Sequence, residues 1–413
     1  MTTDAMAGGD GLPPADLLEG VRVLDLTNVL SGPYATYQIA MLGAEVIKVE
    51  NPAGGDLARS LGASPALNAQ LMGTSFLAQN AGKKSVTLDL KKPQGKALFA
   101  RLIETADVLI ENYRPRVMSR LGFAYEAVRA INPAIVYCAI SGFGQDGPLS
   151  GNPAYDQIVQ GYSGVMSITG DSESAPLRVG YPLCDTLGGM GAAFAIASAL
   201  FRRERTGKGC YIDLSMLDST ISALGWAVSN YLIAGVEARP IGNQNMTAAP
   251  SGAFRTGDGP INIAANKQEQ FEALCKIVDL PELANDPRFA EREARKTNRH
   301  ELNRLLEGAL AKKSAQEWET LLNAAGIPAG RILTVPEVLA HPQIAARDLV
   351  QQLPLDKGAL EHVRVVRAGF ALGDGQPGAR SAPPVLGADN ESIYGALGLD
   401  EAALSDLKSS GVI

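Results

Sequence analysis

One aspartate stands directly before a glycine-rich segment and is the side chain of this sequence best placed to react. Asp185 follows a short apolar run and precedes Thr186-Leu-Gly-Gly-Met-Gly191, which has the composition of a helix start. Free backbone N–H groups at a helix N-terminus favour an ionised carboxylate and could also hold a developing oxyanion. The residues alone leave two interpretations open, a reactive carboxylate and an ordinary aspartate that caps the helix.

The other reactive side chains narrow the possible chemistry. Cys184 adjoins Asp185, but no histidine or lysine lies nearby in the sequence to lower its pKa, so we interpret it as a packed thiol. The three histidines, His300, His341 and His362, all stand in the last third of the chain. Chemistry in the first two thirds therefore has to use carboxylates, hydroxyls, thiols or lysines.

The overall composition argues against several classes of protein. The chain has 413 residues, a net charge of -7 and 46% hydrophobic residues, enough for a large core. Its acidic balance, without a block of lysine or arginine, argues against a nucleic-acid partner. The four widely spaced cysteines suggest neither disulfides nor a zinc site. Because the apolar runs are shorter than the ~20 residues of a membrane helix and the N-terminal segment lacks the basic cluster of a secretory signal, we expect a cytoplasmic protein with no membrane association and no metal.

The elements that position Asp185 follow an alternating pattern. From Val21 onward, short β-branched apolar runs alternate with helix-like segments, as in the βα units of a parallel sheet. The predicted strands are Val21–Leu26, Glu45–Val49, Ser85–Leu88, Val108–Ile110, Ile135–Ala139 and Tyr211–Leu214, and the predicted helices include Tyr34–Leu42, Gly95–Thr105, Tyr125–Ile131, Thr186–Arg205 and Met216–Ile233. This order predicts an α/β fold with a doubly wound parallel sheet, which binds ligands at the carboxyl ends of its strands.

The composition changes after these elements. Residues 241–260 are rich in Gly, Pro, Asn, Ala and Thr, and we interpret them as a loop that leads into a second, smaller α+β domain. The elements predicted for this domain are a strand at Ile261–Ala264 and helices at Gln268–Val278, Arg299–Lys312 and Ala315–Ala324.

A set of short motifs indicates a family. The usual P-loop and hydrolase-elbow patterns, G-x-x-x-x-G-K-[ST] and G-x-S-x-G, are absent. The motifs that are present, in order from about Leu18 to the C-terminus, are Val23-Leu-Asp-Leu-Thr27 with Ser31-Gly-Pro33, Leu42-Gly-Ala-Glu-Val-Ile-Lys-Val-Glu50, Gly54-Gly-Asp56, Asn80–Lys91, Ala106-Asp-Val-Leu-Ile-Glu-Asn-Tyr113, Ser141-Gly-Phe-Gly144 and Arg203-Glu-Arg-Thr-Gly-Lys-Gly209. Together they resemble the family III CoA transferases, which include formyl-CoA:oxalate transferase and the carnitine and bile-acid CoA transferases.

The resemblance implies that Asp185 is the catalytic residue and that coenzyme A is a substrate, with no permanently bound cofactor. The positions that contact CoA in the family correspond to Leu30, Ser31, Asn51, Leu88, Asp89, Leu90, Lys91, Asn112, Tyr113, Arg114 and Arg120. Asn51 departs from formyl-CoA transferase, which carries an arginine there. Lys91 and Arg120 suit the CoA phosphates by charge.

Tyr155 and Asp156 fall where the family places polar active-site residues, although Asp156 could equally be a structural cap. The α-methylacyl-CoA racemases share the fold but carry a histidine within Gly-His-Asp, where this chain has Ala154-Tyr155-Asp156. A racemase moves its proton between two bases, and this chain lacks the second one. The departure favours a transferase.

The resemblance also implies the arrangement of the chain. The large domain would be built from residues 18–225 and 331–413, the small domain from residues 226–330, and two identical chains would interlock as a homodimer. The stretch Ala248–Gly252 of the small domain is the predicted lid or acid-binding edge, and residues 60–76 and 242–252 are predicted to shape the acid pocket.

Transfer of CoA must conserve the thioester energy, so a covalent carrier is needed. We expect Asp185 to form a mixed anhydride with the donor acyl group and then an aspartyl-CoA thioester, with backbone N–H groups around Thr186–Gly189 as oxyanion donors. The expected donor is succinyl-CoA, and the expected acceptor is a small diacid such as mesaconate, itaconate, citramalate or glutarate, with oxalate as the next choice. Three other readings stay open: a racemase with another base, an intramolecular CoA mutase, and a non-catalytic CoA-binding protein.

Overall fold

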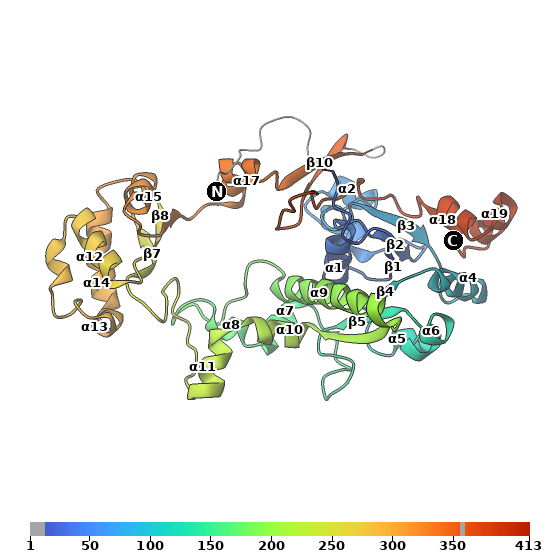
Figure 1. The fold of residues 1–413 in the computed structure, drawn as a ribbon, viewed down its shortest axis with the longest axis horizontal. Coiled ribbons are helices and arrows are strands. Elements are labelled where there is room, and N and C mark those ends of the chain that lie inside the picture. The colour runs from blue at the N-terminus through green and yellow to red at the C-terminus, as the bar shows by residue number, and fades with distance from the viewer. Residues whose placement is uncertain (1–12, 356–359) are drawn as a thin grey trace. The chain divides into compact units, whose positions relative to one another are not determined.

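The computed structural model describes residues 13–355 and 360–413, which form two compact units (Figure 1). The first contains the described residues up to Gly164, Val179–Ile233 and Gln343–Ile413, and the second contains Val165–Arg178 and Ala234–Pro342. Compared with the predicted domain ranges, residues 226–233 lie in the first unit, and residues 165–178 and 331–342 lie in the second. The N–H of Gly242 donates to the carbonyl of Gly170 at 2.7 Å, which ties residues 165–178 to the second unit.

A six-stranded parallel sheet forms the centre of the first unit. Its strands run in the order β3 (Lys83–Thr87), β2 (Glu45–Glu50), β1 (Arg22–Asp25), β4 (Val108–Glu111), β5 (Val136–Ser141) and β6 (Cys210–Ser215). The chain winds outward in one direction from β1 through β2 to β3 and then in the other from β4 to β6, so the direction reverses between β1 and β4. The predicted doubly wound parallel sheet is confirmed, and its switch point lies between the loops that follow β1 and β4.

Helices cover both faces of this sheet because its strands are apolar on both sides. On one face, α1 (Ser31–Ala40) and α9 (Leu183–Thr206) pack their apolar residues against Val23, Val108 and Val136. On the other face, α4 (Pro93–Glu104), α6 (Tyr125–Ile131) and α18 (Asn390–Ala396) pack around a second core. The remaining elements of this unit are η1 (Leu57–Ser60), α2 (Pro65–Ala69), α3 (Thr74–Leu77), α5 (Val117–Leu121), α7 (Asp156–Tyr162), α10 (Met216–Ala223), α11 (Trp226–Ala234), α17 (Pro342–Ala346), β10 (Val350–Pro354), β11 (His362–Val366) and α19 (Glu401–Ser409). The last residue of α11 and the first residue of α17 belong to the second unit.

The second unit has its own core of helices packed on a small antiparallel sheet. The sheet order is β7 (Ser251–Arg255), β8 (Pro260–Ala264) and β9 (Ala329–Arg331). Its helices are α8 (Val165–Ile168), α12 (Gln268–Ile277), η2 (Pro281–Ala284), α13 (Arg292–Thr297), α14 (Arg299–Leu310), α15 (Ala315–Ala324) and α16 (Val335–Leu339).

Two predicted elements differ from the structure. The single helix predicted for Met216–Ile233 is divided into α10 and α11, because Gly225 between them has a φ of 52° that a continuous right-handed helix excludes. Residues 241–260 are not all loop, since β7 occupies Ser251–Arg255 within them. Its short, glycine-bearing sequence gave no alternating pattern from which a strand could be predicted.

Helix α9 is longer than the apolar run considered in the sequence. It has 24 residues, and an 18-residue window within it has a mean hydropathy of 1.4, which by length and composition alone would allow it to cross a membrane. One face of the helix packs on the sheet, with Ala192, Ile196 and Leu200 buried against it.

Candidate active site

Four predicted CoA-binding segments meet at the carboxyl edge of the sheet. Leu30 and Ser31 follow β1, Asn51 follows β2, residues 88–91 follow β3, and residues 112–120 follow β4. These four strands are direct neighbours in the order β3, β2, β1, β4, so the loops after them also lie next to one another. The sequence therefore places these residues at the edge where parallel α/β sheets bind ligands.

The exposed cations of this edge are available to an anionic ligand. Lys91, Arg114 and Arg120 are exposed, as is Arg116, and within residues 13–355 and 360–413 none of the four makes an ion pair with a carboxylate. A guanidinium group without a carboxylate partner is suited to bind phosphate. Two neighbours are different, because Leu88 is only 2% exposed and Tyr113 packs against the same core, so both side chains serve the fold.

Asp185 lies near the start of α9 but does not cap it. Helix α9 begins at Leu183, two residues before the aspartate, so the interpretation of Asp185 as an ordinary N-cap is wrong. The cap is provided by Asp156, the first residue of α7, whose Oδ1 accepts hydrogen bonds from the N–H groups of Cys184 (2.8 Å) and Asp185 (3.4 Å). Asp156 is buried, and its Oδ2 accepts from Gln160 Nε2 at 2.7 Å. The sequence had left open whether Asp156 is an active-site residue or a structural cap, and its hydrogen bonds show a cap. Its predicted neighbour Tyr155 has a side chain that is 66% exposed.

The predicted oxyanion donors at Thr186–Gly189 are not free. The first four N–H groups of a helix lack intrahelical partners, but Leu183 donates to Tyr181 O, Thr186 donates to Pro182 O, and Asp156 accepts from the other two. The N–H groups from Leu187 onward lie within the helix and bond to carbonyls one turn earlier. This expectation was therefore wrong, because the helix starts earlier than the glycine-rich sequence indicated.

The environment of Asp185 favours a partly protonated carboxyl. Burial, followed by the negative charge of Asp156, raises the pKa of Asp185 to about 7. Burial also raises the pKa of the adjacent Cys184 thiol to about 11, which keeps it protonated and agrees with its interpretation as a packed thiol. Near neutral pH, Asp185 can thus be present as the nucleophilic carboxylate, whereas Cys184 cannot form a thiolate.

Two glycines let the start of α1 approach the helix that carries Asp185. A Cβ on Gly189 would lie 2.5 Å from the carbonyl oxygen of Ser31 and 2.9 Å from Cδ1 of Tyr34. A Cβ on Gly188 would lie 3.0 Å from Oγ of Ser31. The loop after β1 and the first turns of α9 are therefore in direct contact, and the predicted CoA contacts Leu30 and Ser31 lie beside the helix start that contains Asp185.

Replacing Gly189 by alanine is expected to separate these two segments. The new methyl group meets the backbone of Ser31, which cannot rotate away, so we expect a loss of about 1–3 kcal/mol in the free energy of unfolding and a lower rate of the enzyme. Gly308→Ala in α14 is the matched control, because its Cβ would have nothing within 4 Å and should stabilise the helix by about 0.5–1 kcal/mol. Equal thermal stability of the Gly189→Ala variant and the wild type would contradict the close approach.

Six buried charges of the first unit were not identified as functional from the sequence. They form three ion pairs, Lys48–Asp56 (2.9 Å), Arg59–Glu50 (2.7 Å) and Lys83–Asp25 (3.1 Å). A signal was present, since Lys48 stands inside the predicted strand Glu45–Val49 and Glu50 directly follows it. In a sheet covered on both faces, charges are buried only when they are paired.

The predicted lid does not behave as a flexible loop. Ala248, Ala249 and Ser251 are each at most 5% exposed, and Ser251 and Gly252 belong to β7. Three arginines of the second unit bind the preceding backbone, through contacts from Arg299 to Asn245 O, Arg292 to Thr247 O and Arg295 to Ala249 O. The structure therefore does not show a flexible loop at Ala248–Gly252, because burial and these hydrogen bonds fix the segment within its unit, and its role as a lid or acid-binding edge stays a prediction. Among the described residues, no three His, Cys, Asp or Glu side chains gather where they could hold a metal ion.

Comparison with known proteins agrees with this geometry. The sequence pattern of CoA-transferase family III matches residues 18–390 of this chain. The chain is 38% identical to the mouse protein named succinyl-CoA:glutarate CoA-transferase over 99% of this chain and 95% of that protein, and 44% identical to acetyl-CoA:oxalate CoA-transferase of Acetobacter aceti over 82% and 86%. A solved structure of a CaiB/BaiF family protein from Brucella suis has a TM-score of 0.82 and 33% identity, and the match covers 94% of this chain and 100% of the other. The chain belongs to CoA-transferase family III and is a CoA transferase.

Proposed function

We propose that this enzyme transfers CoA from succinyl-CoA to a small dicarboxylic acid and that Asp185 is its covalent carrier. The observation that carries the proposal is the position of Asp185, which is partly buried and lies beside the loop after β1 at the carboxyl edge of the sheet. Relatives named succinyl-CoA:glutarate CoA-transferase and succinyl-CoA:D-citramalate CoA-transferase support a diacid acceptor, at 38% and 34% identity. Glutarate is the acceptor that we place first, and oxalate follows from the 44% identical relative.

The proposed reaction has four balanced steps. The Asp185 carboxylate attacks the donor carbonyl, which forms a mixed anhydride and releases CoA thiolate. The thiolate attacks the aspartyl carbonyl of the anhydride, which forms the aspartyl-CoA thioester and releases the donor acid. The acceptor carboxylate then attacks this thioester and displaces CoA thiolate again, giving a second anhydride. In the last step the thiolate attacks the acceptor carbonyl, so the new acyl-CoA leaves and the Asp185 carboxylate is restored.

A mass-spectrometric exchange assay tests this function. Succinyl-CoA is incubated with the enzyme and with each of glutarate, citramalate, mesaconate, itaconate and oxalate, and new acyl-CoA species are measured. We expect a new acyl-CoA thioester only when an acid is added, because the carboxylate of that acid is the group that receives CoA. A new product without added acid would indicate an intramolecular mutase, and deuterium entering the α-carbon of an acyl-CoA would indicate a racemase.

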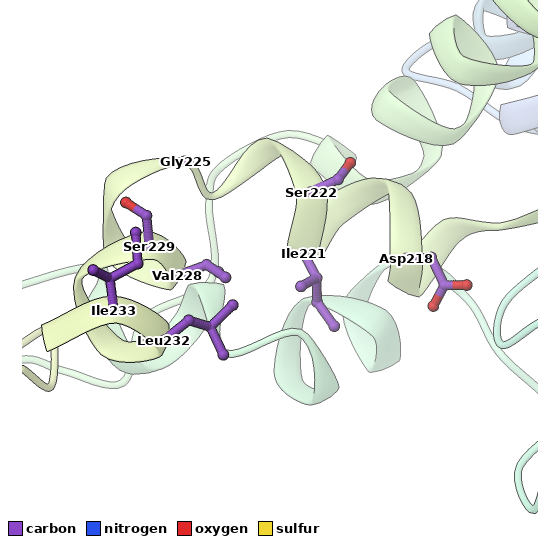
Figure 2. A pocket seen from close by; sticks show the side chains of 8 residues that line it. All are labelled: Asp218, Ile221, Ser222, Gly225, Val228, Ser229, Leu232 and Ile233. Carbon is purple, nitrogen blue, oxygen red and sulfur yellow. The ribbon is translucent and has the colours of Figure 1, made fainter. Parts of the chain in front are cut away.

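We further propose that the enzyme works as a homodimer in which two chains interlock. Helix α11 supports this, because none of its described residues is buried although its sequence is strongly apolar. Trp226, Tyr231, Leu232 and Ile233 are 62–86% exposed in the single chain. A cavity of about 440 Å³ lies between α10 and α11 and is lined mainly by apolar side chains such as Ile221, Val228 and Leu232 (Figure 2). A continuous exposed apolar surface of this kind is typical of an interface, and a second copy of the chain is the occupant that we propose.

Placing a charge in this surface is expected to prevent the two chains from assembling into the interlocked dimer when the variant is produced. Leu232→Glu introduces a carboxylate that would have to be desolvated at the interface, so light scattering should show a shift toward monomer. Leu17→Glu is the control, because Leu17 is also exposed in the first unit (58%) but lies outside the α10–α11 surface. A monomeric wild type, or an unchanged mass for Leu232→Glu, would reject the proposed interface.

A further inference from the structure

The loop between β1 and α1 has its backbone held almost entirely by side chains. From the N–H of Thr27 to the N–H of Val29, five consecutive backbone polar groups form hydrogen bonds with side chains. These side chains come from β1, from β2, from the residue after β4 and from the N-cap of η1. The bonds are Thr27 N to Asp25 Oδ1 (2.8 Å), Lys48 Nζ to Thr27 O (2.7 Å), Asn28 N to Asn112 Oδ1 (2.8 Å), Asn112 Nδ2 to Asn28 O (2.8 Å) and Val29 N to Asp56 Oδ1 (2.9 Å).

The conformation that these bonds impose is a strained one. Val29 has a φ of 67°, in the left-handed region that β-branched residues rarely enter. Such a conformation persists only where the surrounding structure determines it, and it is most common at ligand-binding and active sites. The bond from Val29 N to Asp56 acts directly on the strained residue, so Asp56 is the side chain best placed to maintain it.

Asp56 is in turn fixed by a buried charge. Its Oδ2 lies 2.9 Å from Nζ of Lys48, and both side chains are 0% exposed. Lys48 also donates to Thr27 O, so this single ion pair holds both sides of the turn, at Thr27 and at Val29. An ion pair this deep contributes little to net stability when compared with apolar residues of similar volume, which favours a role in fixing the conformation of the loop.

The loop connects this ion pair to the active site. Leu30 and Ser31 follow Val29 directly, and Ser31 packs on Gly188 and Gly189 of α9, one turn after Asp185. The hydroxyl of Ser31 is buried and has no hydrogen-bond partner in the described chain. A shift of Val29 would therefore move Ser31 relative to the helix that carries the nucleophile.

We propose that Asp56 and Lys48 are positioning residues for acyl-CoA, acting through Val29 to hold the loop that presents Leu30 and Ser31 beside Asp185. This proposal rests on the proposed function and on the expectation from the sequence that Leu30 and Ser31 contact CoA. Neither residue touches the reacting atoms. Their loss should weaken binding of acyl-CoA and the rate of its reaction, while the affinity for the acceptor acid changes little.

Two double variants isolate the hydrogen bond to Val29. Lys48→Met/Asp56→Asn removes both buried charges but keeps an oxygen that can accept from Val29 N, whereas Lys48→Met/Asp56→Leu removes the charges and the acceptor. We expect the leucine variant to have a kcat/KM for succinyl-CoA about 10–100-fold below that of the asparagine variant, since displacement of a binding group by about 1 Å can cost that much. The KM for the acceptor acid should stay within about twofold. Calorimetric binding of CoA to both proteins provides a readout that does not depend on turnover.

A third variant separates the loop from other roles of Asp56. Asp56 Oδ1 also accepts from Ala58 N and so caps η1, a role that the leucine variant loses as well. Adding Val29→Gly should recover at least about tenfold in kcat/KM and in CoA affinity, because glycine adopts a φ of 67° without strain. It cannot restore the cap.

Equal CoA affinity of the two double variants, or no recovery by Val29→Gly, would overturn the proposal. If the leucine variant does not fold, Lys48→Met/Asp56→Ala also removes the charges and the acceptor for Val29 N, with a smaller side chain, and permits the same comparison with and without Val29→Gly. A wild type that binds CoA but transfers it to no acid would refute the proposed function, and the binding comparison would still decide the role of Asp56 and Lys48.

Discussion

Replacing Asp185 by alanine is expected to lower CoA exchange by about four orders of magnitude or more, the loss usual when a covalent nucleophile is removed. CoA itself should still bind, because the cations Lys91, Arg114 and Arg120 belong to other segments of the edge. Asp258→Ala is a suitable control: Asp258 is another aspartate beside a helix start, where its Oδ1 accepts the N–H of Ala315 in the second unit, and it has no proposed part in transfer. Exchange by Asp185→Ala at more than about one per cent of the wild-type rate would reject Asp185 as the carrier.

Asparagine at the same position is expected to stabilise the protein while it inactivates the enzyme. The folded protein holds the pKa of Asp185 at about 7, above its value of 3.8 in the unfolded chain, so the folded state disfavours the carboxylate. The stabilisation associated with the neutral form is complete below the unfolded pKa and is lost as the pH rises through about 7. Asp185→Asn should therefore exceed the wild type by up to about 4 kcal/mol in the free energy of unfolding at pH 8, and the difference should nearly disappear around pH 4.

The pH dependence of transfer is the second large expected effect. Because the ionised carboxylate attacks the donor, the rate of the wild type should rise with pH through a midpoint near 7. Asp156→Asn removes the neighbouring negative charge but keeps an oxygen that can cap α9, so the midpoint should move to lower pH. At pH 6 the gain can reach about tenfold, since a group with a pKa near 7 is ionised there to about one tenth.

The same variant has a structural consequence that can be measured separately. In Asp156→Asn, an amide NH2 group would replace Oδ2, which now accepts a hydrogen bond from Gln160 Nε2. Two donors would then face each other, so the free energy of unfolding should fall by about 1–2 kcal/mol. Asp171→Asn, which changes an exposed aspartate of the second unit, should leave the pH profile in place. An unchanged midpoint in Asp156→Asn would mean that Asp156 does not act electrostatically on Asp185.

The sheet and the edge that carries the site could be predicted because they depend on local patterns. All six parallel strands were predicted to within a few residues, and the helix at Tyr125–Ile131 was predicted with its observed bounds. Knowing which strands are parallel is enough to place the loops after β1, β2, β3 and β4 on one edge. The position of Asp185 near a helix start also followed from the glycines that come after it.

The contacts across the fold could not be predicted in the same way. The cap of α9 comes from Asp156, which is 29 residues away from Asp185 in sequence, and only the folded chain brings them together. Val29 shows the same limit, because no local preference of a valine indicates a left-handed φ. The lid was predicted from Pro, Gly and Ala content, but whether such a segment is mobile depends on partners such as Arg295.

The three buried ion pairs of the first unit have a consequence for the evolution of this enzyme. Apolar residues of similar volume often match or exceed the stability of a buried ion pair. A population selected only for heat resistance could therefore replace Lys48–Asp56 or Lys83–Asp25 by apolar pairs without penalty. Selection for turnover would oppose the change at Lys48–Asp56, and the two kinds of selection should give lineages that keep the same sheet but differ in the residues beneath the loop after β1.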